Sequence, residues 1–282
     1  MAINPIESLR CPLDGAPLKK TPSSWICLSG HNFDIASQGY IHLLPVQNKR
    51  SRDPGDSKEM VAARRRFLDS GAYKNIAEWV NTSTWQDLPS SKTISCLDAG
   101  CGDGYYLRQL AESAPAKLSI ELMGLDISKW AVLAAAKAAK NIAWVVGSNA
   151  NLPVETSSID RLLCLFGFPV YPEFARVLKS GGYLLQVDAG PEHLRELREI
   201  IYPRLKPERN SESKTPEGFV FQNADSLHYK TTLNNTAQIA DLLAMTPHLF
   251  RATPEGRARA FALQHLDITV DVRLAKFRCA KN

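Results

Sequence analysis

The stretch of sequence that decides the fold is Leu97-Asp98-Ala99-Gly100-Cys101-Gly102-Asp103-Gly104. An apolar run over residues 93–97 predicts a short buried strand, and a helical pattern over 105–113 follows the glycines. A glycine-rich turn between a strand and a helix is typical of a ligand-binding crevice at the carboxyl edge of a parallel sheet. Glycines there let the main chain approach a ligand closely, while the helix N-terminus offers free N–H donors.

Strands and helices alternate outward from this stretch, beginning near residue 76. Further strands are predicted over 120–125, 143–146, 159–166 and 183–187. One further helix is predicted from its N-cap Ser128 to Lys140, and another over 173–178, where Gly181-Gly182 signals its end. The alternation predicts an α/β fold with a parallel, doubly wound, Rossmann-like sheet.

Two carboxylates and an amide indicate which ligand the glycine loop binds. Asp126 lies at the end of the second strand, where a carboxylate can accept hydrogen bonds from two ribose hydroxyls. The loop reads G-x-G-x-G and so departs from the dinucleotide fingerprint G-x-G-x-x-G. Asp98 would repel a pyrophosphate and favour an ammonium group, and Asn149 can pair with the edge of an adenine. We therefore expect S-adenosylmethionine as cofactor, bound by Asp98, Gly100, Gly102, Gly104, Asp126 and Asn149.

Composition places the chain among globular proteins. Its 282 residues, 44% hydrophobic and 22% charged, suit one catalytic domain and a small module. Residues 1–10 contain no apolar signal region, and no apolar run approaches the roughly 20 residues that span a bilayer. The six cysteines are thinly spread, unlike those of a secreted disulfide framework. We expect a soluble, cytoplasmic protein with reduced thiols and no membrane association.

The chain divides into three predicted sections: a cysteine-containing module over 1–45, a basic linker and helix over 46–75, and the α/β domain over 76–282. The first section holds three zinc ligand types, Cys11, Cys27 and His31, and Asp14 stands where a cysteine would complete the set. About 45 residues bury too little apolar surface to fold alone, and a structural metal offsets that deficit. The alternative is a metal-free module with two buried thiols.

The net charge of +5 is concentrated in one stretch. Residues 47–66 hold seven basic side chains against three acidic ones, and a helical pattern begins at Lys58. The stretch is either a solvated linker and helix face or a phosphate-contacting patch beside the active site. At the end of the fourth strand, Phe166-Gly-Phe168-Pro169 offers an aromatic ring to a flipped-out base, with core packing as the alternative for Phe166.

The chain also resembles a known family, the bacterial 23S ribosomal RNA (guanine-N1)-methyltransferases of the large-subunit methyltransferase A type, which include macrolide-resistance relatives. The resemblance runs through most of the chain. It rests on Cys11-Pro-Leu, Cys27-x3-His31-x-Phe-Asp34, Gly39-Tyr40, Leu43-Leu-Pro-Val-Gln47, Lys49-Arg-Ser-Arg-Asp-Pro-Gly-Asp56, Arg64-Arg65, Phe67-Leu-Asp69, Tyr73, the glycine loop through Tyr106, Gly190-Pro191-x-His-Leu194 and Met245-Thr-Pro247. The Lys49 to Asp56 string is the most specific of these motifs.

The resemblance implies a class I S-adenosylmethionine-dependent methyltransferase domain with a small N-terminal zinc-binding module that grips RNA. The substrate would be guanine N1 in a hairpin loop of 23S rRNA (position 745 or 748 class), and the enzyme would be a homodimer. Family cofactor contacts fall on Tyr73, Gly102, Asp103, Gly104 and His193. Family zinc ligands fall on Cys11, Cys27 and His31, with Asp14 in place of the fourth cysteine.

The chemistry requires that guanine N1 lose its proton as it receives the methyl group. Asp188, just after the fifth strand, is a candidate base, but the sequence assigns no catalytic residue. The alternatives are a methyltransferase for another RNA or a small molecule, an NAD-dependent oxidoreductase, and a non-catalytic RNA-binding protein with a vestigial pocket.

Overall fold

The computed structural model describes residues 2–48, 51–88, 93–205 and 215–280. Within these ranges one nine-stranded sheet runs in the order β11-β12-β10-β9-β6-β7-β8-β5, and β1 pairs with β7. The strands are β1 Ala2–Pro5, β5 Ile41–His42, β6 Thr93–Ala99, β7 Ser119–Asp126, β8 Ala143–Val146, β9 Ile159–Leu165, β10 Leu178–Ala189, β11 Phe219–Leu233 and β12 Leu266–Cys279. The five strands predicted from sequence correspond to β6 to β10 and are confirmed.

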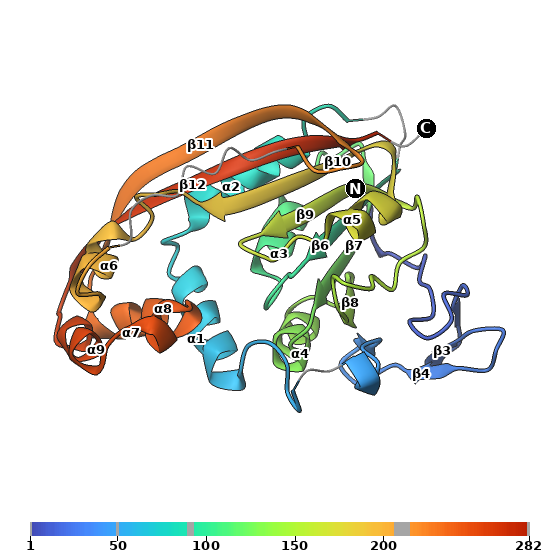
Figure 1. Cartoon of the computed structure of the whole chain (residues 1–282). Coiled ribbons are helices and arrows are strands. Elements are labelled where there is room, and N and C mark those ends of the chain that lie inside the picture. The colour runs from blue at the N-terminus through green and yellow to red at the C-terminus, as the bar shows by residue number, and fades with distance from the viewer. Residues whose placement is uncertain (1, 49–50, 89–92, 206–214, 281–282) are drawn as a thin grey trace.

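The sheet is parallel from β5 to β10 and mixed beyond β10. β12 runs antiparallel to β10, and β11 runs antiparallel to β12 over fourteen paired residues. Figure 1 shows β10, β12 and β11 as long ribbons side by side. The predicted parallel sheet therefore describes its first part only. Neither β11 nor β12 was predicted. β11 is exposed along most of its length and lacks the apolar alternation of a half-buried strand. β12 does carry that alternation, from Leu266 to Leu274, so its signal was present in the sequence but missed.

Nine α-helices are present in the described residues: α1 Lys58–Asp69, α2 Lys74–Thr84, α3 Tyr105–Glu112, α4 Lys129–Ala138, α5 Tyr171–Val177, α6 Arg195–Ile201, α7 Thr236–Met245, α8 His248–Arg251 and α9 Pro254–Phe261. The predicted N-cap is confirmed, because Ser128 accepts a hydrogen bond from the Ala131 amide at the start of α4. Ser57 caps α1 in the same way. None of the helices in these ranges is long and apolar enough to cross a membrane.

The N-terminal residues form a small sheet of their own and also join the large one. β2 Lys19–Lys20, β3 Ser24–Ile26 and β4 Asn32–Asp34 make an antiparallel sheet, followed by the short 3₁₀ helix η1 Val46–Asn48. On either side of it, β1 pairs with β7 and β5 pairs with β8. Figure 1 shows this blue region and the orange to red helices α6 to α9 on opposite sides of the view.

The carboxyl ends of the parallel strands meet at one edge of the sheet. β6 lies between β7 and β9, so the chain leaves β6 in one direction for β7 and β8 and in the other for β9 and β10. This reversal is the topological switch point at which open α/β sheets bind ligands. The loops that follow β6, β7, β8 and β9 therefore define the candidate site.

Candidate functional site

The glycine loop after β6 is shaped by three positive φ angles. Gly100, Gly102 and Gly104 have φ of 102°, 55° and 78°. A Cβ atom at Gly100 would meet nothing within 4 Å, whereas one at Gly104 would lie 2.4 Å from a ring carbon of the buried Trp144. The loop therefore rests on Trp144 from below and leaves open space above Gly100.

Asp98, at the end of β6, is a buried carboxylate with 1% of its surface exposed. Neither of its oxygens has a hydrogen-bond partner among the described residues. Burial, with a smaller contribution from the charge of Asp126, raises the pKa of Asp98 to about 8. Burying a carboxyl group without a partner costs free energy, and a cationic ligand group beside it would remove that cost.

Asp126, at the end of β7, anchors the glycine loop. Its carboxylate accepts the Gly102 amide at 2.9 Å and the Ser128 amide at 2.8 Å. Burial raises the pKa of Asp126, and these two hydrogen bonds oppose the rise. The carboxylate lies at the carboxyl edge of the sheet, where its remaining lone pairs can accept ribose hydroxyls.

Two more buried polar atoms around the loop, Tyr106 Oη and Asn149 Oδ1, lack a hydrogen-bond partner within the described chain. Asp103 Oδ2 also makes no hydrogen bond there, but it lies 3.8 Å from the Arg108 guanidinium in an ion pair. Asn149 is fixed by its amide nitrogen, which donates to the carbonyls of Ala99 at 3.4 Å and Phe168 at 3.2 Å. Buried polar atoms are normally paired, so a cluster of unpaired ones marks a place where a polar ligand fits. A nucleoside carrying a charged amine supplies both a cation for the Asp98 carboxylate and hydrogen-bond partners for these neutral polar atoms.

Tyr73 and His193, 120 residues apart, meet in a buried hydrogen bond of 3.1 Å between Tyr73 Oη and His193 Nε2. Because His193 Nδ1 accepts the Asp271 amide at 3.3 Å, the ring proton of a neutral His193 is on Nε2 and is donated to Tyr73. Burial lowers the pKa of His193 to about 4, which keeps the ring neutral. The Tyr73 hydroxyl proton then remains available for another acceptor.

Phe166 follows β9 in a left-handed conformation with φ of 55°, which is unusual for an aromatic residue. Its ring stacks on His193 with centroids 6.1 Å apart, and 39% of its surface is exposed. Phe168, two residues on, is 90% exposed. Phe166 is therefore not a core residue, and the two rings flank the same edge of the sheet as the glycine loop.

The basic segment packs partly onto this site. The Asp56 carbonyl accepts the Ser128 hydroxyl at 2.7 Å, and Asp56 pairs with Arg64 at 2.5 Å. Arg64 also donates to the Met245 carbonyl, and its guanidinium lies beside Gly102. Arg66 pairs with Asp241 on α7. Several of these charges thus stabilise the chain itself, while Lys49 and Arg50 lie outside the described residues.

The four predicted metal ligands gather in one place. The ligand atoms of Cys11, Asp14, Cys27 and His31 all lie within 4.8 Å of one another. His31 Nδ1 is 3.4 Å from each sulfur and 3.2 Å from Asp14 Oδ2, which is 3.5 Å from Cys27 Sγ. Zinc–ligand bonds of about 2.0–2.3 Å in a tetrahedron separate neighbouring ligand atoms by about 3.3–3.8 Å. The four separations given above lie at or close to this range and the other two are at most 4.8 Å, so a small adjustment would let this donor set hold zinc.

The structure brings most of the predicted residues together and places further residues beside them. The loops carrying Asp98, Asp126 and Asn149 converge, and Tyr73 pairs with His193. Sequence reasoning did not assign roles to Tyr106 or to the Asp56–Arg64 pair. Tyr106 follows the glycine loop by two residues, at the start of α3, so its closeness to the loop could have been predicted from the sequence.

Comparisons with known proteins agree with this geometry. The family model of the RlmA N-terminal zinc ribbon matches residues 9–52, and the methyltransferase domain model matches residues 96–182. The 23S rRNA (guanine(748)-N(1))-methyltransferase of Streptomyces fradiae is 31% identical, over 93% of this chain and 92% of the relative. Two further relatives are also 31% identical: the "Putative 23S rRNA (guanine-N(1)-)-methyltransferase YxjB" of Bacillus subtilis (strain 168), over 93% and 94%, and a protein of the same description from Micromonospora griseorubida, over 97% and 98%.

The packing of the loop on Trp144 makes a testable prediction. Both Gly104→Ala and Gly102→Ala place a Cβ atom on a residue with positive φ, at a cost of about 1–2 kcal/mol each. Only Gly104→Ala also drives that atom into Trp144 and Ala135, which adds about 1–3 kcal/mol of overpacking. Urea unfolding will show the larger loss of stability for Gly104→Ala. Equal losses would mean that the loop does not rest on Trp144.

Proposed function

Because the chain belongs to the 23S rRNA (guanine-N1)-methyltransferase family, we propose that it transfers a methyl group from S-adenosylmethionine to N1 of a guanine in a hairpin loop of 23S rRNA. One observation carries the methyl-donor half of this proposal. Buried oxygens of Asp98, Tyr106 and Asn149 that have no hydrogen-bond partner in the described chain surround a glycine loop with open space above Gly100. The relatives, similar over 93% of this chain, support the RNA half.

Each candidate residue has a task that its surroundings suit. S-adenosylmethionine, when bound, would supply an activated methyl group. Asp98 would hold the ammonium group of the donor, Asp126 its ribose hydroxyls, and Asn149 the edge of its adenine. Tyr73 would donate its free hydroxyl proton, while His193 fixes the orientation of that hydroxyl. Since the methyl group is already activated, the main contribution of the protein is to position the two reactants.

The target base needs a stacking surface and a proton acceptor. Phe166 and Phe168 present exposed rings at the edge where the methyl group would lie, and a flipped guanine can stack on them. Asp188, at the end of β10, is exposed and accepts a hydrogen bond from Gln186 at 2.7 Å. Its carboxylate is the acceptor that we propose for the N1 proton.

We further propose that Cys11, Asp14, Cys27 and His31 hold one zinc ion, that the chain acts as a homodimer, and that it works in the cytoplasm. The zinc ion would crosslink the two turns of the N-terminal module. For the dimer, the supporting feature is β11, where the strand order ends and where Val220 and Phe221 are 44% and 47% exposed. Unpaired strand edges with exposed apolar side chains favour association with a second chain.

The proposed activity is tested with radiolabelled S-adenosylmethionine and 23S rRNA from cells that lack the modification. We expect one labelled guanine, blocked at N1, which reverse transcription will locate in a hairpin loop. As a control, rRNA already methylated at that position will accept no label. Label on another RNA, or on small molecules alone, would support one of the alternative substrates and contradict the rRNA assignment.

The raised pKa of Asp98 predicts that binding of the methyl donor releases a proton. With a pKa of about 8, the Asp98 carboxyl is mostly protonated at pH 7, and an ammonium ligand favours its ionised form. At pH 7, calorimetry in two buffers of different ionisation enthalpy will show release of close to one proton per S-adenosylhomocysteine bound. Asp98→Asn will bind more weakly and release none, whereas Asp188→Asn will behave as wild type. Proton release that persists in Asp98→Asn would contradict this role.

The metal cluster predicts zinc at one ion per chain in the purified protein. Asp14→Cys replaces a carboxylate by a softer thiolate, so zinc will resist a competing chelator more strongly, by about tenfold or more. Asp14→Ala will lose zinc more readily, and Asp34→Ala, outside the cluster, will not change it. Elemental analysis that finds no zinc in a folded, active protein would remove the metal from the account.

A further inference from the structure

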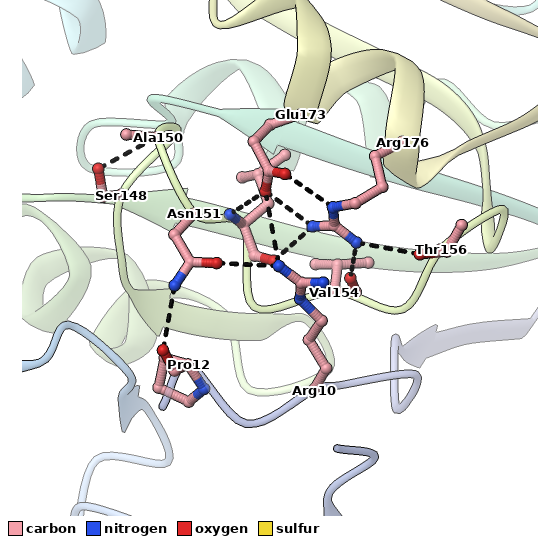
Figure 2. Close-up of polar contacts among 10 residues, drawn as sticks. Arg10, Pro12, Ser148, Ala150, Asn151, Val154, Thr156, Glu173 and Arg176 are labelled. Atoms are coloured by element: carbon pink, nitrogen blue, oxygen red, sulfur yellow. Dashed lines mark hydrogen bonds and ion pairs between the residues drawn. The ribbon is translucent and has the colours of Figure 1, made fainter. Parts of the chain in front are cut away.

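The turn that carries Cys11 is joined to the loop that carries Asn149. Asn151, two residues beyond Asn149, accepts a hydrogen bond from Arg10 at 2.9 Å and donates one to the Pro12 carbonyl at 3.1 Å. Arg10 and Pro12 are the two neighbours of Cys11. Figure 2 shows Asn151 bridging from its loop to both of them.

The same loop is held from its other side by α5. Glu173 accepts the Leu152 amide at 2.7 Å, and Arg176 donates to the carbonyls of Leu152 and Val154 at 2.8 Å each. Arg176 and Glu173 are themselves paired at 2.8 Å, and Glu173 lies 4.0 Å from Arg10 (Figure 2). α5 holds one side of the loop. The other side is held at Asn149 by the Ala99 and Phe168 carbonyls and at Asn151 by the N-terminal turn.

Backbone contacts run beside the side-chain bridge. Leu9 and Val154 form an isolated antiparallel bridge, the Arg10 amide donates to Pro153, and the Glu155 amide donates to Ser8. These contacts lie toward the far end of the loop, whereas Asn151 lies close to Asn149. A movement of Cys11 would therefore be transmitted through Asn151 to Asn149, the residue proposed to pair with the adenine.

We propose that Asn151, with Arg10, is a positioning residue that couples metal binding at Cys11 to methyl-donor binding beside Asn149. The inference rests on the proposed function of the glycine-loop site. An ion that fixes Cys11 also fixes Arg10 and the Pro12 carbonyl, and these fix the loop through Asn151. Because coupling between two ligands is reciprocal, the methyl donor will in turn strengthen metal retention.

The test measures the affinity for S-adenosylhomocysteine by calorimetry in zinc-loaded protein and in protein treated with a chelator. We expect removal of zinc from the wild type to weaken binding by about five- to tenfold, the lower part of the usual range for coupled sites. Zinc-loaded Asn151→Ala will bind as weakly as metal-free wild type and will respond little to the chelator. Asn151→Asp keeps an acceptor for Arg10 but cannot donate to Pro12, so it will show an intermediate response.

Lys20→Ala is the matched control, because it removes an ion pair with Glu7 in the same module without touching the loop. It will retain the full zinc response. If metal-free protein does not stay folded, chelator competition will measure zinc affinity with and without S-adenosylhomocysteine, where we expect tighter zinc with ligand in wild type only. A zinc response that persists in Asn151→Ala, or its absence in wild type, would overturn the coupling. Failure of zinc-loaded wild type to bind the ligand at all would instead contradict the proposed function.

Discussion

The carboxyl group of Asp98 is buried at the end of the central strand, and neither oxygen has a partner in the described part of the chain. Taking such a group out of water costs on the order of several kcal/mol when it is ionised and unpaired. An aspartate at this position therefore indicates a ligand that compensates for the cost of burying it. A cation that enters the space above the glycine loop removes the deficit, and the ammonium group of an amino-acid-bearing nucleoside is such a cation.

The surrounding structure holds this space open. Trp144 on β8 supports the loop from below at Gly104 and packs against Gly124 of β7, and Asp126 holds the loop through the Gly102 amide. The Tyr73–His193 pair is in turn oriented by the Asp271 amide on β12. The site is thus assembled from strands on both sides of the switch point. The N-terminal turn reaches it as well, through Asn151.

The sequence predicted the part of the fold in which local pattern and burial agree. The strand over 143–146 was placed at the bounds it has in the structure, and Ser128 was identified as the cap it is, because fully buried strands and caps leave strong local signals. β11 left no such signal, since water surrounds most of its side chains, whereas β12 carries the alternation of a half-buried strand and was missed. Asp98, Asp126 and Asn149 were predicted as cofactor contacts from their places after strands and their chemistry, and the structure brings the loops that carry them together. Tyr73 and His193 were predicted only through the family resemblance, because their meeting depends on a tertiary contact across 120 residues.

A crystal structure of the protein grown with S-adenosylhomocysteine will show whether Asp98 pairs with the amine of the methyl donor. We predict the nucleoside in the crevice above Gly100, with its amine beside Asp98 and its ribose hydroxyls on Asp126. Well-ordered ligand bound elsewhere, with the Asp98 carboxyl still unpartnered beside an empty loop, would contradict it.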